Sequence, residues 1–129
     1  MKKYTITLTE DQMMLIADCV EDIHRFLCGD TELHHTTSVL RNEQETKRRL
    51  KELQPLVTPD LCLGSQYSWS GSSCPDEFQR KMIAKTYYLY REMLHQRNLA
   101  NNIDNVYTSP TLRCRDSGEP IKITWEETA

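Results

Sequence analysis

The sequence predicts an α+β fold in which a small antiparallel sheet packs against two to three helices. Apolar and polar residues alternate over 3–8 and again over 121–125, which is the period-two pattern of half-buried strands. Between these segments apolar residues recur at three- and four-residue steps, as they do in amphipathic helices. We therefore expect the order β-α-α-α-β-β, with the N-terminal strand joining a C-terminal hairpin and the helices covering one face of the sheet.

The first helix is expected directly after the first strand. Thr9 and Gln12 have the spacing of a capping box, which satisfies amide groups at a helix start. Gly29 supplies the left-handed residue that ends many helices. The apolar stripe predicted to face the core consists of Met13, Ile16, Ala17, Val20, Ile23 and Leu27.

Two further helices are expected before the hairpin. The second covers about 39–54 and ends at Pro55, and a long loop over 55–74, of a length often associated with function, follows it. Ser73 is expected to cap the third helix, which fades near Asn101. Its predicted core stripe consists of Phe78, Met82, Ile83, Leu89, Tyr90, Met93 and Leu94. The hairpin combines extended segments at 106–107, 111–114 and 121–125 with turn residues at 116–120.

Length and composition indicate one folded domain spanning 1–129. The chain has 129 residues and 15.1 kDa, with 38% hydrophobic and 27% charged residues, which suits a globular protein. No apolar run approaches the roughly 18 residues of a membrane span, and the first residues lack the features of a signal peptide. We expect a cytoplasmic protein. Its net charge of −3 argues against general nucleic-acid binding.

The sequence contains no strong catalytic motif, so we expect neither an enzyme nor a cofactor. Five cysteines without a CxxC pair predict free thiols. His24, Cys28, His34 and His35 gather near the end of the first helix and could bind a metal. Adjacent histidines on a polar turn are more often surface residues, so we expect no metal site.

The last third of the chain combines aromatic and cationic residues. Tyrosine rings can stack on a purine, and arginine guanidinium groups bind phosphate oxygens in a bidentate manner. The set consists of Tyr87, Tyr88, Tyr90, Arg91, His95, Tyr107, Arg113 and Arg115. It has the chemistry of nucleotide binding without a catalytic base, although a core tyrosine and solubilising arginines would give the same composition. Arg25, four residues after Glu21, is either half of an exposed ion pair or part of an anion clamp.

Four short motifs, in matching order over most of the chain, resemble the first described family of phage Thoeris anti-defence proteins. The motifs are Arg25-Phe26-Leu27-Cys28-Gly29, Tyr87-Tyr88-Leu89-Tyr90 with His95, Asn105-Val106-Tyr107-Thr108-Ser109-Pro110, and Ser117-Gly118-Glu119-Pro120-Ile121-Lys122-Ile123. The chain departs from the family at Asp30, where Gln is common, and in the middle loop that contains Tyr67, Trp69 and Cys74.

The resemblance implies a sponge protein, which sequesters a cyclic ADP-ribose isomer without cleaving it and so blocks Thoeris immunity. It also implies homo-oligomers, with dimers assembling into hexamers, a location in the host cytoplasm, and, in some members, separate sites for cyclic oligonucleotides. By residue type and position it assigns ligand binding to Arg25 and Arg113, and to Tyr88 and Asn98 on the long helix.

Two other functions remain open on the sequence. One is a phage DNA-binding regulator that uses the basic stretch 47–51 of the second helix, against which the acidic chain and the thin apolar stripe of this helix argue. The other is a nucleotide-cleaving enzyme with His24 or His95 as general base.

Overall fold

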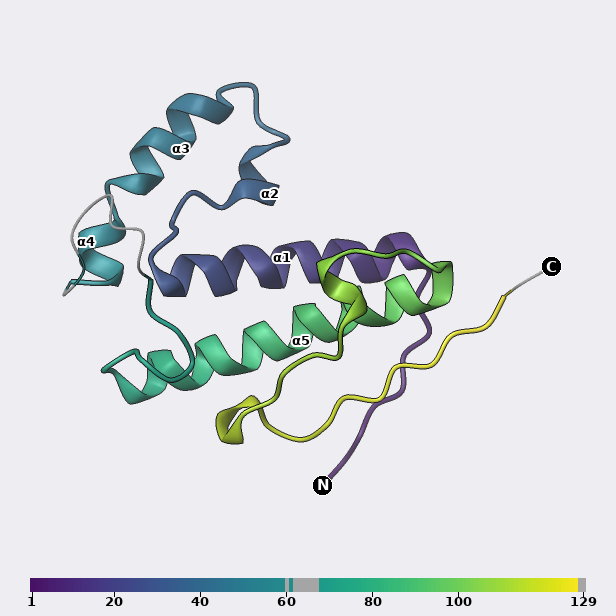
Figure 1. Cartoon of the computed structure of the whole chain (residues 1–129). Coiled ribbons are helices and arrows are strands. Elements are labelled where there is room, and N and C mark those ends of the chain that lie inside the picture. Colours follow the sequence, from purple (N-terminus) through teal and green to yellow (C-terminus); the bar gives the residue numbers. More distant parts are fainter. Residues whose placement is uncertain (60, 62–67, 128–129) are drawn as a thin grey trace.

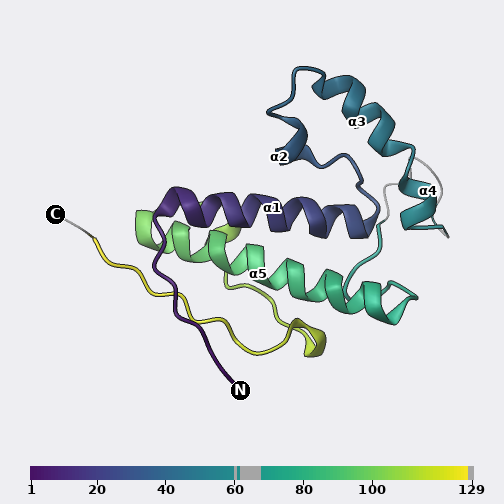
Figure 2. The same ribbon diagram turned by 180° about the vertical axis from the view of Figure 1, so that it is seen from behind.

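The structure, a computed structural model, describes residues 1–59, 61 and 68–127. Two long helices, α1 (Glu10–Cys28) and α5 (Glu77–Asn101), pack side by side and run in opposite directions (Figure 1). Three shorter helices, α2 (His34–Thr37), α3 (Glu43–Lys51) and α4 (Gln54–Val57), form an arm beyond the end of α1, which is also visible from behind (Figure 2). After α5 the chain folds back over it through the 3-10 turns η1 (Val106–Thr108) and η2 (Arg115–Ser117).

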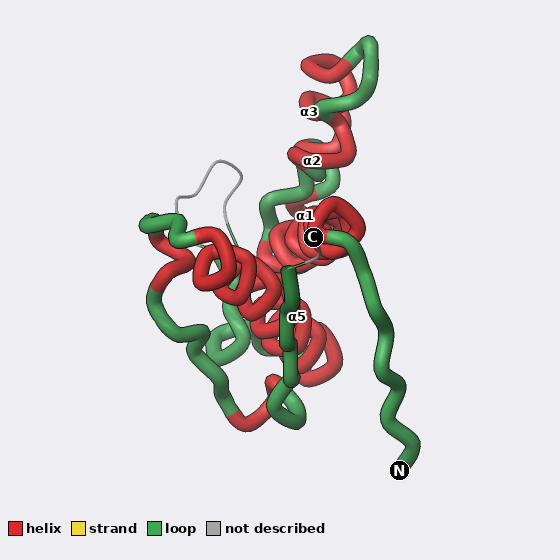
Figure 3. Tube along the Cα trace, turned by 90° about the vertical axis from the view of Figure 1, so that its right-hand side faces the viewer, coloured by secondary structure: helices red, strands yellow, loops and turns green. Residues whose placement is uncertain are grey.

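The predicted sheet is wrong, because none of the residues that the structure describes forms a β-strand (Figure 3). Residues 3–8 are exposed, with Tyr4 at 84% and Ile6 at 73%. In the predicted hairpin, the Ile121 N–H donates to the Tyr88 hydroxyl at 2.9 Å instead of to a neighbouring strand. Alternation favours an extended backbone, but a strand also needs a partner for its amide and carbonyl groups. The described chain is therefore helical.

Both predicted boundaries of the first helix are confirmed. The Thr9 hydroxyl accepts from the Gln12 N–H at 3.2 Å, and the Gln12 side chain accepts from the Thr9 N–H at 2.9 Å, which completes the capping box. Gly29 ends α1 at a φ of 109°. An added Cβ at this glycine would lie 3.0 Å from the Thr58 hydroxyl oxygen, so both backbone conformation and space require glycine here.

The second helix differs from its prediction, and the third differs at its start. The expected helix over 39–54 is divided into α3 and α4, and Pro55 lies in the first turn of α4, where its missing N–H costs little. Helix α5 is capped by Asp76, which accepts from the Gln79 N–H at 2.8 Å. The Ser73 hydroxyl accepts from the Ser70 N–H instead. The expected end of the helix is confirmed, since Asn102 closes it at a φ of 53°.

The core consists of two clusters, both with members on α1 and α5. One contains Cys28, Trp69, Cys74 and Ile83, and the other contains Ala17, Tyr90 and Leu94. Four residues of the predicted stripes are exposed instead: Ile16 at 38%, Ile23 at 50%, Phe78 at 85% and Met82 at 48%. On α1 two acidic residues, Glu21 and Asp22, are buried, because α2 covers that side of the helix.

Two findings complete the comparison with the sequence. Cys19, Cys28, Cys74 and Cys114 are free thiols, as predicted, whereas Cys62 lies outside the described residues, as does Tyr67 of the middle loop. No helix within the described ranges has the length and apolarity needed to cross a membrane.

Candidate functional site

Four of the predicted site residues lie on one face of α5. Tyr88, Arg91, His95 and Asn98 follow one another at steps of three, four and three residues, which places them on the same side of a helix. The segment after α5 crosses this side, with η1 and η2 both in contact with the helix. The other three predicted residues of the C-terminal region, Tyr107, Arg113 and Arg115, belong to this segment.

Arg91 is held between two tyrosine rings. Its guanidinium carbon lies 4.7 Å from the centre of the Tyr107 ring and 5.5 Å from that of Tyr87, which are cation–π distances. His95 holds the turn that carries Tyr107, because its Nδ1 lies 2.9 Å from the Tyr107 carbonyl oxygen. Among the residues that the structure describes, no carboxylate lies within ion-pair distance of Arg91. Within the described ranges, the two tyrosine rings are the groups that hold this guanidinium.

Tyr90 connects this arrangement to α1. His24 from α1 packs on the rings of Tyr87 and Tyr90, with centres 5.3 and 5.4 Å apart. Burial raises the pKa of Tyr90 to about 12, and the charges of Glu21, Arg25 and Arg91 all act on its hydroxyl. Arg25 on α1 and Arg91 on α5 therefore both lower the pKa of Tyr90 electrostatically, although burial outweighs them.

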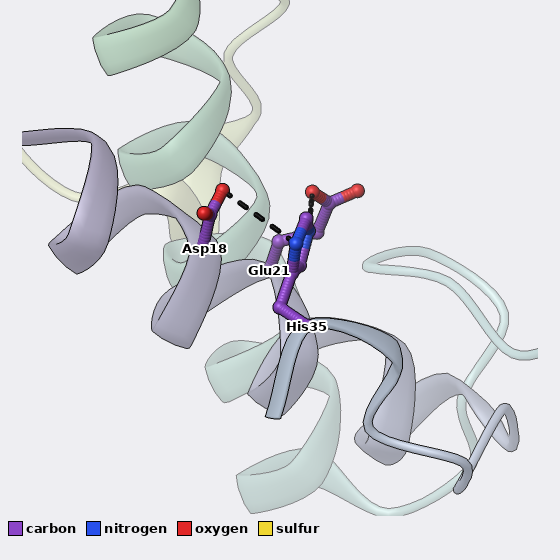
Figure 4. Close-up of side chains that lie close together, drawn as sticks. All are labelled: Asp18, Glu21 and His35. Carbon is purple, nitrogen blue, oxygen red and sulfur yellow. Dashed lines mark hydrogen bonds and ion pairs between the residues drawn. The ribbon is translucent and has the colours of Figure 1, made fainter. Parts of the chain in front are cut away.

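Arg25 differs from Arg91 because it already has a carboxylate partner. Its Nε donates to Glu21 at 2.9 Å, and the Glu21 side chain is only 8% exposed. His35 contacts the same carboxylate at 2.8 Å, with Asp18 3.7 Å from its other ring nitrogen (Figure 4). The arginine side chain is 47% exposed, so it remains accessible from solvent. The predicted ion pair is therefore present, with a buried carboxylate, and the anion clamp stays a prediction.

The charge of His35 depends on this carboxylate. Partial burial lowers the pKa of His35, but the hydrogen bond to Glu21 and the charges of Asp18 and Asp22 raise it by more, so the net shift is upward. Protonated His35 and Arg25 then share Glu21. The backbone N–H of His35 also donates to Asp22, which in addition accepts from the Thr36 N–H and hydroxyl at 2.7 Å.

Tyr88 and Arg113 form a second contact. The Arg113 guanidinium carbon lies 5.4 Å from the centre of the Tyr88 ring and the tyrosine is 4% exposed. Arg113 also donates to the Gly118 carbonyl at 2.6 Å. The chain itself therefore covers the ring that was predicted to stack on a ligand.

The remaining two predicted residues have different environments. Asn98 is 1% exposed and its side-chain amide donates to Asn105, which fixes the start of η1. Arg115 is exposed on η2. A groove between residues 3–8 and 119–124 is lined by none of the eight predicted residues.

The candidate metal ligands have separate partners. His24 Nε2 lies 3.6 Å from the Cys28 sulfur between α1 and α5, whereas His34 contacts Asp30 at 3.0 Å and His35 contacts Glu21. Two other groups place possible ligand atoms within 4.8 Å of one another, namely Asp18 with Glu21 and His35, and Asp30 with Glu32 and His34. In the first group Arg25 already pairs with the buried carboxylate of Glu21. The second group is partly exposed to solvent.

The surroundings of Cys28 also do not favour its thiol as a nucleophile. Burial raises the pKa of Cys28 to about 12, so its thiol stays protonated near neutral pH. Burial lowers the pKa of His24, and its Nδ1 lies 3.1 Å from the Ile83 carbonyl. A neutral imidazole next to a protonated, buried thiol is a core contact.

Sequence reasoning missed the burial of Glu21 and Asp22. The predicted stripe of α1 counted apolar residues only, and the short helix α2, which these carboxylates hold, was not expected. The two adjacent histidines at 34 and 35, followed by threonines, were the available signal.

Comparison with protein-family models, curated proteins and solved structures finds no match to this chain.

Proposed function

We propose that this chain binds and sequesters a cyclic ADP-ribose signalling nucleotide without cleaving it, and so blocks Thoeris immunity as a phage-type anti-defence protein. The observation that carries the proposal is the guanidinium of Arg91, held between Tyr87 and Tyr107 with no ion-pair partner among the described residues. Such a cation can bind phosphate oxygens, and the half-buried rings of Tyr87 and Tyr107 hold it in position.

A second cation supports a ligand with two phosphates. The charges of Arg25 and Arg91 both lower the pKa of Tyr90 against the larger upward effect of burial, and we expect a ligand with two phosphates to use both guanidinium groups. Arg113 and Arg115 add positive charge on the segment that crosses α5. Tyr88 and Asn98 act on the site by holding this segment in place.

Binding without cleavage is the chemistry that these side chains favour. Hydrolysis or transfer needs a positioned nucleophile or an activated water. Cys28 is buried as a thiol, and the Nδ1 of His95 is engaged with the Tyr107 carbonyl. Fixed cations raise the affinity for an anionic ligand without such a group.

The proposal includes a homo-oligomer, in which dimers assemble into hexamers as the family resemblance implies. The alternative, a DNA-binding regulator, is weakened by the charges of α3. Lys47 pairs with Glu43 at 2.9 Å, and Arg48 and Arg49 both pair with Glu45 at 2.8 and 2.9 Å. These pairs offset the positive charge that would face a phosphate backbone.

Calorimetric titration with cyclic ADP-ribose isomers tests the proposal. We expect Arg91→Ala to weaken binding by about 1.5–3 kcal/mol, roughly 10- to 150-fold, because it removes a charge-assisted contact. Arg25→Ala should weaken it less, since Glu21 already engages that arginine. Arg41→Ala removes an exposed guanidinium from the turn before α3 and serves as the matched control.

Recovery of the ligand distinguishes a sponge from an enzyme. After binding, heat denaturation should return the intact nucleotide to the supernatant. A cleaved product would overturn sequestration, and unchanged affinity in Arg91→Ala would overturn the assignment of the site. Absence of binding to every isomer would overturn the proposed ligand.

A further inference from the structure

Glu21 is a buried carboxylate that two cationic side chains share. Its side chain is 8% exposed, and Oε2 accepts from Arg25 at 2.9 Å. The other oxygen, Oε1, lies 2.8 Å from Nε2 of His35 (Figure 4). The arginine belongs to the last turn of α1 and the histidine belongs to α2. Because a buried carboxylate without a positive partner is costly, Glu21 needs at least one of the two.

The state of one partner therefore affects how firmly Glu21 holds the other. A phosphate that binds Arg25 must take the guanidinium from Glu21. When His35 is protonated, the released carboxylate still has a cation at 2.8 Å. When His35 is neutral, the same exchange leaves Glu21 buried without a full positive charge beside it, so the exchange costs more.

The groups around His35 favour its charged form. Partial burial lowers the pKa of His35, but three carboxylates of α1 raise it by more, namely Glu21, Asp18 and Asp22. On α2 itself, His34 contacts Asp30 instead of this cluster. Helix α3 also packs against α2, but no carboxylate of α3, all of which is described, lies within ion-pair distance of His35. The histidine therefore titrates under the control of the α1 carboxylates.

We propose that Glu21 is an internal competitor for Arg25, and that the charge of His35 determines how readily Glu21 gives up this arginine to a phosphate. The inference rests on the proposed function, because it describes how one cation of the proposed site is regulated. Helix α2 stays attached in either state, since Asp22 accepts from the backbone N–H groups of His35 and Thr36.

The competition makes nucleotide binding depend on pH. The chain binds the phosphate best when His35 is protonated, so binding favours uptake of a proton by this histidine. The affinity should be highest below pH 6.5, the ordinary pKa of histidine, and should fall as the pH rises through the raised pKa of His35.

Titration with cyclic ADP-ribose isomers over this pH range tests the competition. Glu21→Gln keeps the shape of the side chain and removes its charge, so at high pH it should bind about fivefold more tightly than the unmodified chain. His35→Gln should bind at every pH as the unmodified chain does at high pH. His34→Gln is the matched control, because this histidine contacts Asp30, and it should keep the pH dependence. Titration of the nucleotide itself affects all four proteins equally.

Two results would overturn the competition. Weaker binding in Glu21→Gln, with an unchanged helical circular dichroism spectrum, would show that the carboxylate positions Arg25 for the ligand. A pH profile that His35→Gln leaves unchanged would show that this histidine does not regulate the site. The second result does not depend on how well the Glu21 variant folds.

A measurement without nucleotide separates this inference from the proposed function. NMR titration of the His35 ring in Arg25→Ala should give a higher pKa than in the unmodified chain, because Glu21 then pairs with His35 alone. Arg41→Ala makes the same charge change on the turn before α3 and should leave this pKa unchanged. An unchanged pKa in Arg25→Ala would overturn the shared carboxylate. A raised pKa in a chain that binds no cyclic ADP-ribose isomer would support the competition for Glu21 and overturn the proposed ligand.

Discussion

Substitutions at Tyr88 distinguish two roles for this residue, stacking on a ligand and supporting the fold. Its ring is 4% exposed beneath Arg113, and its hydroxyl accepts from the Ile121 N–H at 2.9 Å. Tyr88→Phe keeps the ring but leaves the Ile121 N–H without this partner, which costs about 0.5–1.5 kcal/mol of unfolding free energy. Tyr88→Ala also removes the buried ring, and truncations of this kind cost about 3–5 kcal/mol.

Urea denaturation and ligand titration on both variants provide the assay. Because the unfolding free energy falls by about 1–3 kcal/mol per molar urea, the alanine variant should lose roughly 1 M or more in its unfolding midpoint, and the phenylalanine variant at most about half as much. Because Arg113 covers the ring, Tyr88→Phe should affect nucleotide binding only through the lost hydrogen bond to Ile121, and by no more than it lowers the unfolding free energy. An unchanged midpoint in Tyr88→Ala, together with a large loss of affinity, would refute the structural role and restore direct stacking on the ligand.

Three further changes test the framework around the site. Asp22→Ala leaves amide groups at the start of α2 without an acceptor, so the melting temperature should fall by roughly 5–10 °C, and an unchanged value would contradict this capping role. The pKa of His35 is raised in the folded chain by Glu21, once the opposing effect of burial is overcome. Its contribution to stability should be complete below pH 6.5 and lost as the pH rises through the folded pKa, a dependence that His35→Gln should abolish in denaturation curves at several pH values. Gly29→Ala forces a side chain into a φ of 109° against Thr58 and should cost about 1–2 kcal/mol in chemical denaturation, whereas a neutral effect would show that the loop adjusts.

Features that depend on neighbouring residues could be predicted from the sequence. The capping box of Thr9 and Gln12, the left-handed Gly29 and the end of α5 near Asn102 each involve groups within five residues of one another. Such local hydrogen bonds form in any fold that contains the helix. The boundaries of α1 therefore follow from its own sequence.

Features that depend on distant segments could not be predicted in the same way. The alternation at 3–8 gives an extended chain, but whether it joins a sheet depends on a partner elsewhere. Likewise, Ile23 has the spacing of a core residue, yet α5 packs on another side of α1 and α2 covers the side with Asp22. Periodicity shows that a helix has apolar faces, and tertiary contacts decide which of them is buried.

The same limit applies to the candidate site. The sequence gives its residue types, and the fold decides their contacts. The sequence identified the aromatic and cationic residues and the spacing of Glu21 and Arg25, but it did not show that this carboxylate is buried or that Arg91 lies between two tyrosine rings. In the fold, Glu21 engages Arg25 at 2.9 Å, whereas Arg91 has the faces of Tyr87 and Tyr107. A phosphate that binds Arg25 competes with an existing ion pair, so part of its gain is offset. A phosphate that binds Arg91 would displace no ion-pair partner among the described residues from a guanidinium already held in position, and this difference would make Arg91 the stronger anchor for an anionic ligand.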